Sequence, residues 1–238
     1  MIHPTARRLT GRGRALTVDP MRVTRHGLWE MIIGTVALAV VAVGLGFVHP
    51  LASLVVLPVW FWLIAFFRDP ERPIPGDPHV YVSPADGVVS DITPVNDDPL
   101  LGGPGIRVGI FLSVFNVHVN RSPCEGVVTK VIYKEGKFIN AMNHNTASSD
   151  NESNTIVIAD PAGRPVAVVK QIVGLIARRI ICTAVEGTKL GRGERFGMIK
   201  FGSRTELTIP QWLEPQIKVQ VGQKVRGAID LIATTSAE

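Results

Sequence analysis

The chain has 238 residues and a formal net charge of +5, enough for one sizeable domain and an additional element. No basic patch with interleaved aromatic residues is present, which argues against nucleic acid as a partner. The two cysteines, Cys124 and Cys182, form no CxxC motif, so we expect reduced core thiols and neither a disulfide framework nor a cysteine zinc site.

The N-terminal part of the chain is basic and then strongly apolar. Six arginines crowd residues 1–30, and residues 32–67 contain no Asp, Glu, Lys or Arg. His49-Pro50 divides this stretch into two runs, 32–48 and 51–67, each at the short end of the roughly 17–25 residues that a spanning helix needs. Because proline disfavours helical geometry in its predecessor, we predict a helical hairpin over 31–67 that anchors the chain in a membrane.

The charges beside the hairpin predict its orientation. Arginines precede the first run, and Arg68 and Arg72 follow the second, which favours a cytoplasmic position for both flanks. We therefore expect the cytoplasmic membrane, with the following domain on its cytoplasmic face. A cleaved signal peptide is disfavoured because a second apolar run follows at once. A buried hairpin of a soluble protein remains an alternative, since both runs are short.

Residues 68–78 contain four prolines and read as a linker, after which the pattern changes to short β-branched runs broken by Gly, Pro and Asn. This spacing predicts a mainly β, compact barrel or sandwich over 79–238. The two Gly-Lys segments at 186–201 and 219–233 resemble turns of lipoyl- and biotinyl-type hybrid barrels. The expected strands are 79–83, 87–95, 106–112, 116–120, 126–133, 154–159, 166–174, 179–185, 196–201, 205–210 and 225–233.

Two connections in this domain are distinctive. The segment "DPAGRP", residues 160–165, predicts a hairpin loop between two strands. Residues 137–153 form a long polar insertion without strand character. Loops of that length in a compact domain are often functional.

Three side chains are candidates for chemistry: Asp86 in "SPADGVV", His118 in "FLSVFNVHVNRSP" and Ser203 in "FGSR". A serine hydroxyl can be activated by a histidine base that an aspartate orients. Each residue also has an ordinary alternative: a turn aspartate, a hydrogen-bonded core histidine and a bulge serine. No G-x-S-x-G elbow is present, which argues against an α/β-hydrolase. The histidines are scattered without HExxH, so we expect no metal.

The ordered motifs "SPADG", "FLSVFNVHVNRSP", "NHNTASSDNESN" and "IKFGSR" resemble the short bacterial form of phosphatidylserine decarboxylase. The likeness covers about residues 20–235 and includes the hairpin. It implies a proenzyme that cuts itself between Gly202 and Ser203 into a β chain, 1–202, and an α chain, 203–238. These two chains would form a heterodimer, and a higher oligomer of such heterodimers is an alternative.

The resemblance further implies a covalent pyruvoyl group made from Ser203. This group would form a Schiff base with phosphatidylserine in the membrane and yield phosphatidylethanolamine and CO2. His118, oriented by Asp86, would be the base for self-cleavage and the proton donor for decarboxylation. We also expect Arg121, Arg204 and the polar loop containing Asn143 to contact the lipid headgroup, because the arginines lie near His118 and Ser203 in the sequence and the loop is polar.

The sequence departs from the family around the histidine. Relatives more often have Ser-Pro, an aromatic residue and Asp before it, whereas Val114 and Asn116 stand here in place of the proline and the acid. Long-form relatives have a second histidine three positions later, where this chain has Arg121. Two other functions remain alternatives. One is a membrane-tethered serine hydrolase that uses Ser203, His118 and Asp86, and the other is a non-enzymatic, membrane-anchored β-barrel carrier domain, which the two Gly-Lys segments suggest.

Overall fold

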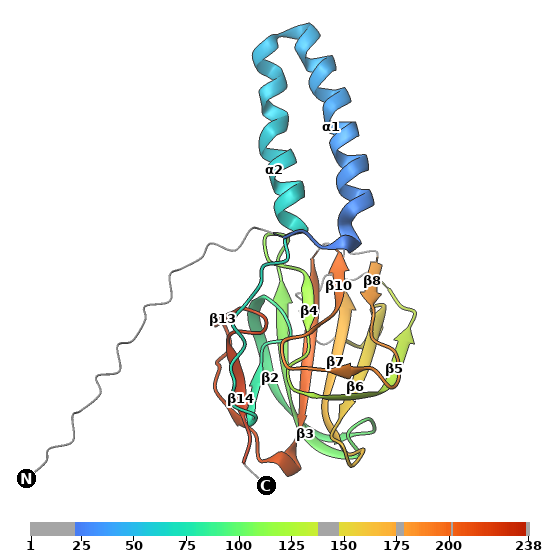
Figure 1. The fold of residues 1–238 in the computed structure, drawn as a ribbon, viewed down its shortest axis with the longest axis vertical. Coiled ribbons are helices and arrows are strands. Elements are labelled where there is room, and N and C mark those ends of the chain that lie inside the picture. The colour runs from blue at the N-terminus through green and yellow to red at the C-terminus, as the bar shows by residue number, and fades with distance from the viewer. Residues whose placement is uncertain (1–21, 138–147, 175–178, 201, 237–238) are drawn as a thin grey trace, which may run out of the picture.

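The computed structural model describes residues 22–137, 148–174, 179–200 and 202–236. It shows a helical hairpin that rises from one end of a β domain, with the C-terminal end of the chain at the opposite end (Figure 1). The predicted mainly β domain preceded by an N-terminal hairpin is therefore confirmed. The helical elements are η1 (Arg25–Gly27), α1 (Leu28–Val48), η2 (Pro50–Val55), α2 (Val56–Phe66) and, within the β domain, η3 (Gln211–Leu213).

The hairpin turns where His49-Pro50 predicted. His49 is extended, its Nδ1 accepts a hydrogen bond from the backbone N–H of Leu51, and Pro50 begins the next helical turn. Within the part of the chain that the structure describes, one helix is long and apolar enough to cross a bilayer, Arg25–Val48, with a mean hydropathy of 2.5. None of the residues of α1 is buried, so its apolar side chains are not covered by the β domain.

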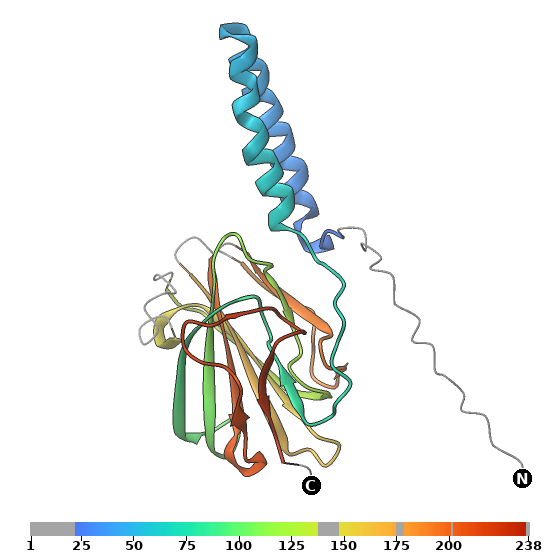
Figure 2. The same cartoon turned by 90° about the vertical axis from the view of Figure 1, so that its left-hand side faces the viewer.

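The β domain contains three sheets, and all its strand pairings are antiparallel. The largest sheet has eight strands in the order β13-β2-β3-β11-β7-β6-β5-β9, and the two small sheets have the orders β4-β10-β8 and β1-β14-β12. Figure 2 shows the large sheet curling around the core. The strands are β1 (Val80–Val82), β2 (Gly87–Asp98), β3 (Gly103–Leu112), β4 (Val119–Arg121), β5 (Gly126–Lys134), β6 (Ser153–Ala159), β7 (Pro165–Val173), β8 (Arg179–Cys182), β9 (Lys189–Leu190), β10 (Arg195–Lys200), β11 (Ser203–Pro210), β12 (Gln216–Ile217), β13 (Lys224–Val225) and β14 (Leu231–Thr234).

Most expected strands are present, with three differences. The strand expected over 116–120 begins only at Val119, so His118 lies just before it. The strand expected over 225–233 is split into β13 and β14. The two-residue strands β9 and β12 are too short to produce the period-two pattern by which a strand is recognised. The loop predicted at 160–165 connects β6 to β7.

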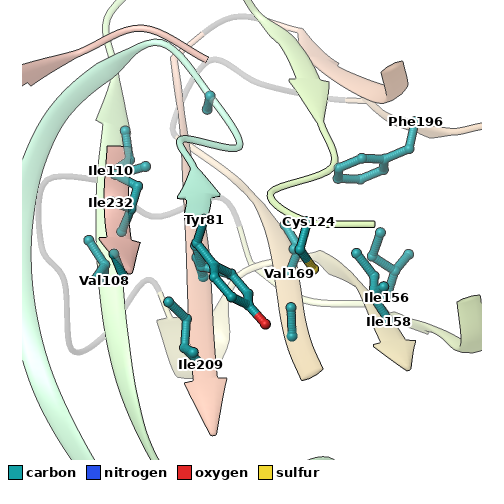
Figure 3. Packing of buried hydrophobic residues seen from close by; sticks show 14 of the residues in the cluster. Tyr81, Val108, Ile110, Cys124, Ile156, Ile158, Val169, Phe196, Ile209 and Ile232 are labelled. Carbon is teal, nitrogen blue, oxygen red and sulfur yellow. The ribbon is translucent and has the colours of Figure 1, made fainter. Parts of the chain in front are cut away.

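A single large apolar cluster fills the interior between the sheets (Figure 3). Alternate residues of the strands contribute to it, as the two-residue period of a strand requires. Each fully buried Ile or Phe side chain contributes about 1.5–3 kcal/mol. Cys124 belongs to this core and Cys182 is half-buried, and both are free thiols. The labelled members are Tyr81, Val108, Ile110, Cys124, Ile156, Ile158, Val169, Phe196, Ile209 and Ile232.

Strand β11 lies in the middle of the large sheet, between β3 and β7. Its first residue, Ser203, pairs with Leu112 at the end of β3 and with Val173 at the end of β7. Strand β10, which precedes it in the chain, runs toward the hairpin (Figure 1). The fold therefore places the Gly202–Ser203 bond at the hairpin end of the β domain.

Candidate active site at the hairpin end of the β domain

Ser203 is held in a closed environment. It is fully buried, and its two backbone neighbours in β3 and β7 fix its position. Its hydroxyl Oγ is buried and has no hydrogen-bond partner among the described residues. Leaving a buried hydroxyl unsatisfied costs about 1–3 kcal/mol, and such groups are rare in folded proteins.

Gly202 gives the backbone before Ser203 an unusual conformation. Its φ is +55°, in the left-handed region that residues with a Cβ rarely adopt. A Cβ at this position would meet only Val114 Cγ1, at 4.0 Å. The glycine is therefore required by backbone angle and not by crowding, and its carbonyl carbon carries no neighbouring side chain that would hinder attack.

His118 is oriented by the loop that precedes it. The Asn116 side-chain oxygen accepts hydrogen bonds from the backbone N–H and the hydroxyl of Ser113, at 2.9 and 2.8 Å. The resulting turn points the Asn116 carbonyl at His118 Nδ1, 3.0 Å away. A carbonyl only accepts, so Nδ1 carries the proton and Nε2 keeps a lone pair. Nε2 is buried and has no hydrogen-bond partner within the described ranges.

The surroundings of His118 keep it neutral. Burial lowers the pKa of His118 to about 4, and the nearby Arg68 guanidinium acts in the same direction. The hydrogen bond to Asn116 and the Asp86 carboxylate oppose this shift without cancelling it. At neutral pH the imidazole is therefore an uncharged base, which is the form that can accept a proton.

Contacts of Val173 show that Ser203 and His118 lie in the same region of the structure. It pairs with Ser203 in the sheet and packs against Ile199, whose backbone N–H donates to the carbonyl of His118. Ser203 Oγ and His118 Nε2 do not hydrogen-bond to each other in this structure. Catalytic hydrogen bonds often form only in the reacting complex, so the arrangement provides a nucleophile and a neutral base at the same end of the domain.

Asp86 was predicted to orient His118, but it bonds to Arg72 and Gly227 instead. Its carboxylate forms two hydrogen bonds with the Arg72 guanidinium, at 2.6 and 2.8 Å, and accepts a third from the backbone N–H of Gly227. No hydrogen bond joins Asp86 to His118 in the described structure. Asp86 influences the histidine only through its charge, and the orienting contact predicted for it is made by the Asn116 carbonyl instead.

The two arginines predicted to contact a headgroup are buried and paired. Arg121 is 3% exposed and bonds to the Asp69 carboxylate at 2.8 Å, while Arg204 is fully buried and pairs with Asp91 and Glu206 at 2.6 and 2.9 Å. In this structure neither guanidinium is open to a headgroup. The third residue of that prediction, Asn143, lies outside the described residues.

Below Ser203, a layer of buried amides crosses the domain interior. Thr205 lies on the same face of β11 as Ser203, because side chains alternate along a strand. Its hydroxyl accepts a hydrogen bond from Asn120, which in turn accepts one from Gln171, each at 2.9 Å. Gln171 also accepts one from Asn154 at 3.2 Å. The sequence offered no signal for this layer, since its members come from four separate strands.

The chain is similar to known proteins over most of its length. The family model for phosphatidylserine decarboxylase matches residues 61–233. Three similar proteins bear the name phosphatidylserine decarboxylase proenzyme. That of Carboxydothermus hydrogenoformans is 42% identical, over 90% of this chain and 97% of its own length. Those of Granulibacter bethesdensis and Solidesulfovibrio magneticus are 48% and 47% identical, over 85% and 89% of this chain and 81% and 95% of their own. The chain belongs to the phosphatidylserine decarboxylase family.

Proposed function

We propose that this chain is an enzyme that converts phosphatidylserine to phosphatidylethanolamine and CO2, with a pyruvoyl group formed from its own Ser203. The observation that carries the proposal is the pair of buried atoms without partners, Ser203 Oγ and His118 Nε2, at one end of a domain of this family. The left-handed backbone at Gly202 supports it, because glycine adopts this conformation readily and leaves the carbonyl before Ser203 without a neighbouring side chain.

The first step that we propose is an acyl shift at the Gly202–Ser203 bond. His118 Nε2 accepts the proton of the Ser203 hydroxyl while Oγ attacks the carbonyl carbon of Gly202. The bond between that carbon and the Ser203 nitrogen then breaks, and the proton passes to the nitrogen. The product is an ester between Gly202 and the Ser203 side chain, with a free amino group on Ser203.

The second step removes the ester. A base takes the Cα proton of Ser203, the bond between Cβ and Oγ breaks, and Gly202 leaves as a carboxylate at the end of the β chain. The remaining dehydroalanine takes up water and releases ammonia, which leaves a ketone at the first position of the α chain. These steps need no external oxidant or reductant.

The position of Ser203 fits a pyruvoyl group. A small, uncharged ketone suits a buried site, and pairing to β3 and β7 would hold the new chain end in place. Such a group supplies an electrophilic carbonyl and a sink for the electrons that CO2 leaves behind. His118 Nε2 can hold the proton that is returned to the substrate carbon, and burial of the site limits access of water to it.

The membrane part of the proposal concerns substrate delivery. We propose that 31–67 anchors the enzyme in the cytoplasmic membrane after a basic segment over 1–30, and that 79–238 is the catalytic domain, joined through the linker 68–78. Phosphatidylserine is an anionic membrane lipid, and basic residues near the membrane surface contribute about 1 kcal/mol each to its attraction. The hairpin rises from one end of the β domain (Figure 2), and a membrane-anchored hairpin would place the candidate site at that end close to the lipid headgroups.

A denaturing gel with intact-mass measurement tests the proposal. Active protein should contain two chains, the smaller one comprising residues 203–238 with a blocked N-terminus. Ser203→Ala and His118→Ala should remain uncut. Active protein that remains a single chain of 25.8 kDa would refute self-cleavage, and labelling of that chain by a fluorophosphonate probe would instead identify a serine hydrolase.

A further inference from the structure

The last turn of the membrane hairpin lies directly on the candidate base. The Phe66 ring, at the end of α2, stacks on the His118 imidazole with ring centroids 4.4 Å apart and an angle of 33° between the planes. Phe66 is only 1% exposed. Phe67 packs against its edge, with ring centroids 5.0 Å apart, and Met198 of β10 completes the buried cluster. The Phe66 ring therefore covers the imidazole, and Phe67 and Met198 hold the Phe66 ring in place.

Arg68 joins the end of α2 to the loop that orients His118. Its guanidinium donates to the carbonyl of Ala65 in α2 and to the carbonyl of Phe115, both at 2.7 Å. Phe115 immediately precedes Asn116, whose carbonyl holds His118 Nδ1. The two contacts that define the imidazole's orientation, one on its face and one at Nδ1, thus both depend on the residues that end the hairpin.

The two ends of the hairpin are joined to each other, and α1 is also attached to the β domain. The backbone N–H of Thr24 donates to the carbonyl of Phe67 at 2.8 Å, and that of Asp69 donates to the carbonyl of Arg22 at 2.7 Å. Glu30 of α1 forms an ion pair with Lys200, which is 5% exposed and lies two residues before Gly202. The Glu30–Lys200 ion pair therefore links the hairpin to strand β10, which leads to the cleavage site.

We propose that Phe66 is a positioning residue for His118, and that the hairpin consequently forms part of the active site as well as the membrane anchor. The inference rests on the proposed function, in which His118 moves protons. A flat ring against the imidazole restricts rotation about its terminal side-chain bond, which is otherwise broad. Displacing a catalytic group by about 1 Å can slow a reaction about 10²-fold, so loss of the flat surface should be visible as a rate effect.

The test compares variants of the full chain that keep or remove the aromatic face. Phe66→Leu and Phe66→Met remain apolar but lack a flat ring, whereas Phe66→Tyr retains it. Phe61→Leu is the matched control, because Phe61 lies on the same helix and is 62% exposed. Each chain is made by cell-free translation into lipid nanodiscs, and formation of the chain 203–238 is followed over time by intact mass.

We expect Phe66→Leu and Phe66→Met to slow cleavage about tenfold or more, while Phe66→Tyr and Phe61→Leu stay close to the wild-type rate. The acid limb of the rate's pH profile should also move upward in the two non-aromatic variants, since Phe66 helps to exclude water from His118. The charged groups acting on that histidine, Arg68 and Asp86, are unchanged in all four chains.

The same substitutions in an uncut Ser203→Ala chain report folding by thermal unfolding. Folded Phe66→Leu or Phe66→Met that cleaves at the wild-type rate would overturn the inference, and so would Phe66→Tyr cleaving as slowly as Phe66→Leu. Loss of folding in both non-aromatic variants would also count against it, because the role would then be structural. Failure of the wild-type chain to cleave would instead refute the proposed function.

Discussion

The environment of His118 predicts how self-cleavage depends on pH. Only the neutral imidazole can accept the Ser203 proton, and burial lowers the pKa of His118 to about 4 from an ordinary value of 6.5. At pH 5.5 a histidine with a pKa of about 4 is about 97% neutral, whereas an ordinary one is about 9% neutral. We therefore expect the cleavage rate to be nearly constant from pH 8 to pH 5 and to fall about tenfold per pH unit below pH 4.

The same shift predicts a loss of stability in acid. The unfolded state takes up a proton near pH 6.5 and the folded state only near pH 4. The unfolded state therefore binds more protons between these values, and stability falls as the pH is lowered through this range. Between pH 7 and pH 4.5 the contribution of His118 amounts to about 2 kcal/mol.

Two measurements check this reasoning. The first is the rate of appearance of the chain 203–238 after transfer of freshly translated protein to buffers from pH 8 to pH 3.5. The second is urea unfolding of detergent-solubilised Ser203→Ala protein at pH 7 and 4.5, compared with a Ser203→Ala/His118→Gln chain that lacks the imidazole. The difference between the two chains isolates His118 from other titrating groups. A cleavage profile with its acid midpoint near 6.5 would show that His118 is not buried as described, or is not the base.

Two substitutions, at Asp86 and Gly202, test the residues around the candidate site. Asp86→Asn removes the charge that pairs with buried Arg72, and breaking such a pair should destabilise the fold by about 3–5 kcal/mol. Urea unfolding in the uncut background measures this against exposed Asp97→Asn, and equal stability of the two variants would contradict the pairing. Gly202→Ala places a Cβ at a φ of +55°, which should cost about 1–2 kcal/mol and slow cleavage. Gly76→Ala has open space and no positive φ, so equal rates in these two variants would argue against a conformational role for Gly202.

Local patterns were sufficient to predict the hairpin and most strands of the large sheet, because an uncharged apolar run divided by His49-Pro50 and short β-branched runs broken by Gly, Pro and Asn are visible in a short window. His118 was expected within a strand for the same reason. The turn that Asn116 makes with Ser113 ends the regular pattern just before it, and a single asparagine between apolar residues gives no clear sign of this.

The partners of the charged residues could not be predicted locally. Arg204 meets Asp91 from a strand 113 residues earlier, and Arg121 meets Asp69 across 52 residues. A charged residue in a sequence is ordinarily expected at the surface, and both arginines were expected to contact a headgroup because they lie near His118 and Ser203 in the sequence. The contact of Phe66 with His118 likewise depends on how the hairpin packs against the β domain. An aromatic residue at the end of an apolar run does not by itself indicate such a contact.

The central position of β11 has a consequence for the lifetime of the proposed mature enzyme. Cutting before Ser203 makes β11 part of a separate polypeptide that is hydrogen-bonded on both sides, to β3 and to β7. The two products can then separate only if the large sheet opens through its middle. After the sheet has opened, the two chains must reassociate in a bimolecular reaction, at low concentration and without the peptide bond that held them together during folding. The uncut chain can refold by itself, whereas the two-chain complex forms only once, from the folded precursor. Global unfolding of the mature enzyme is therefore practically irreversible.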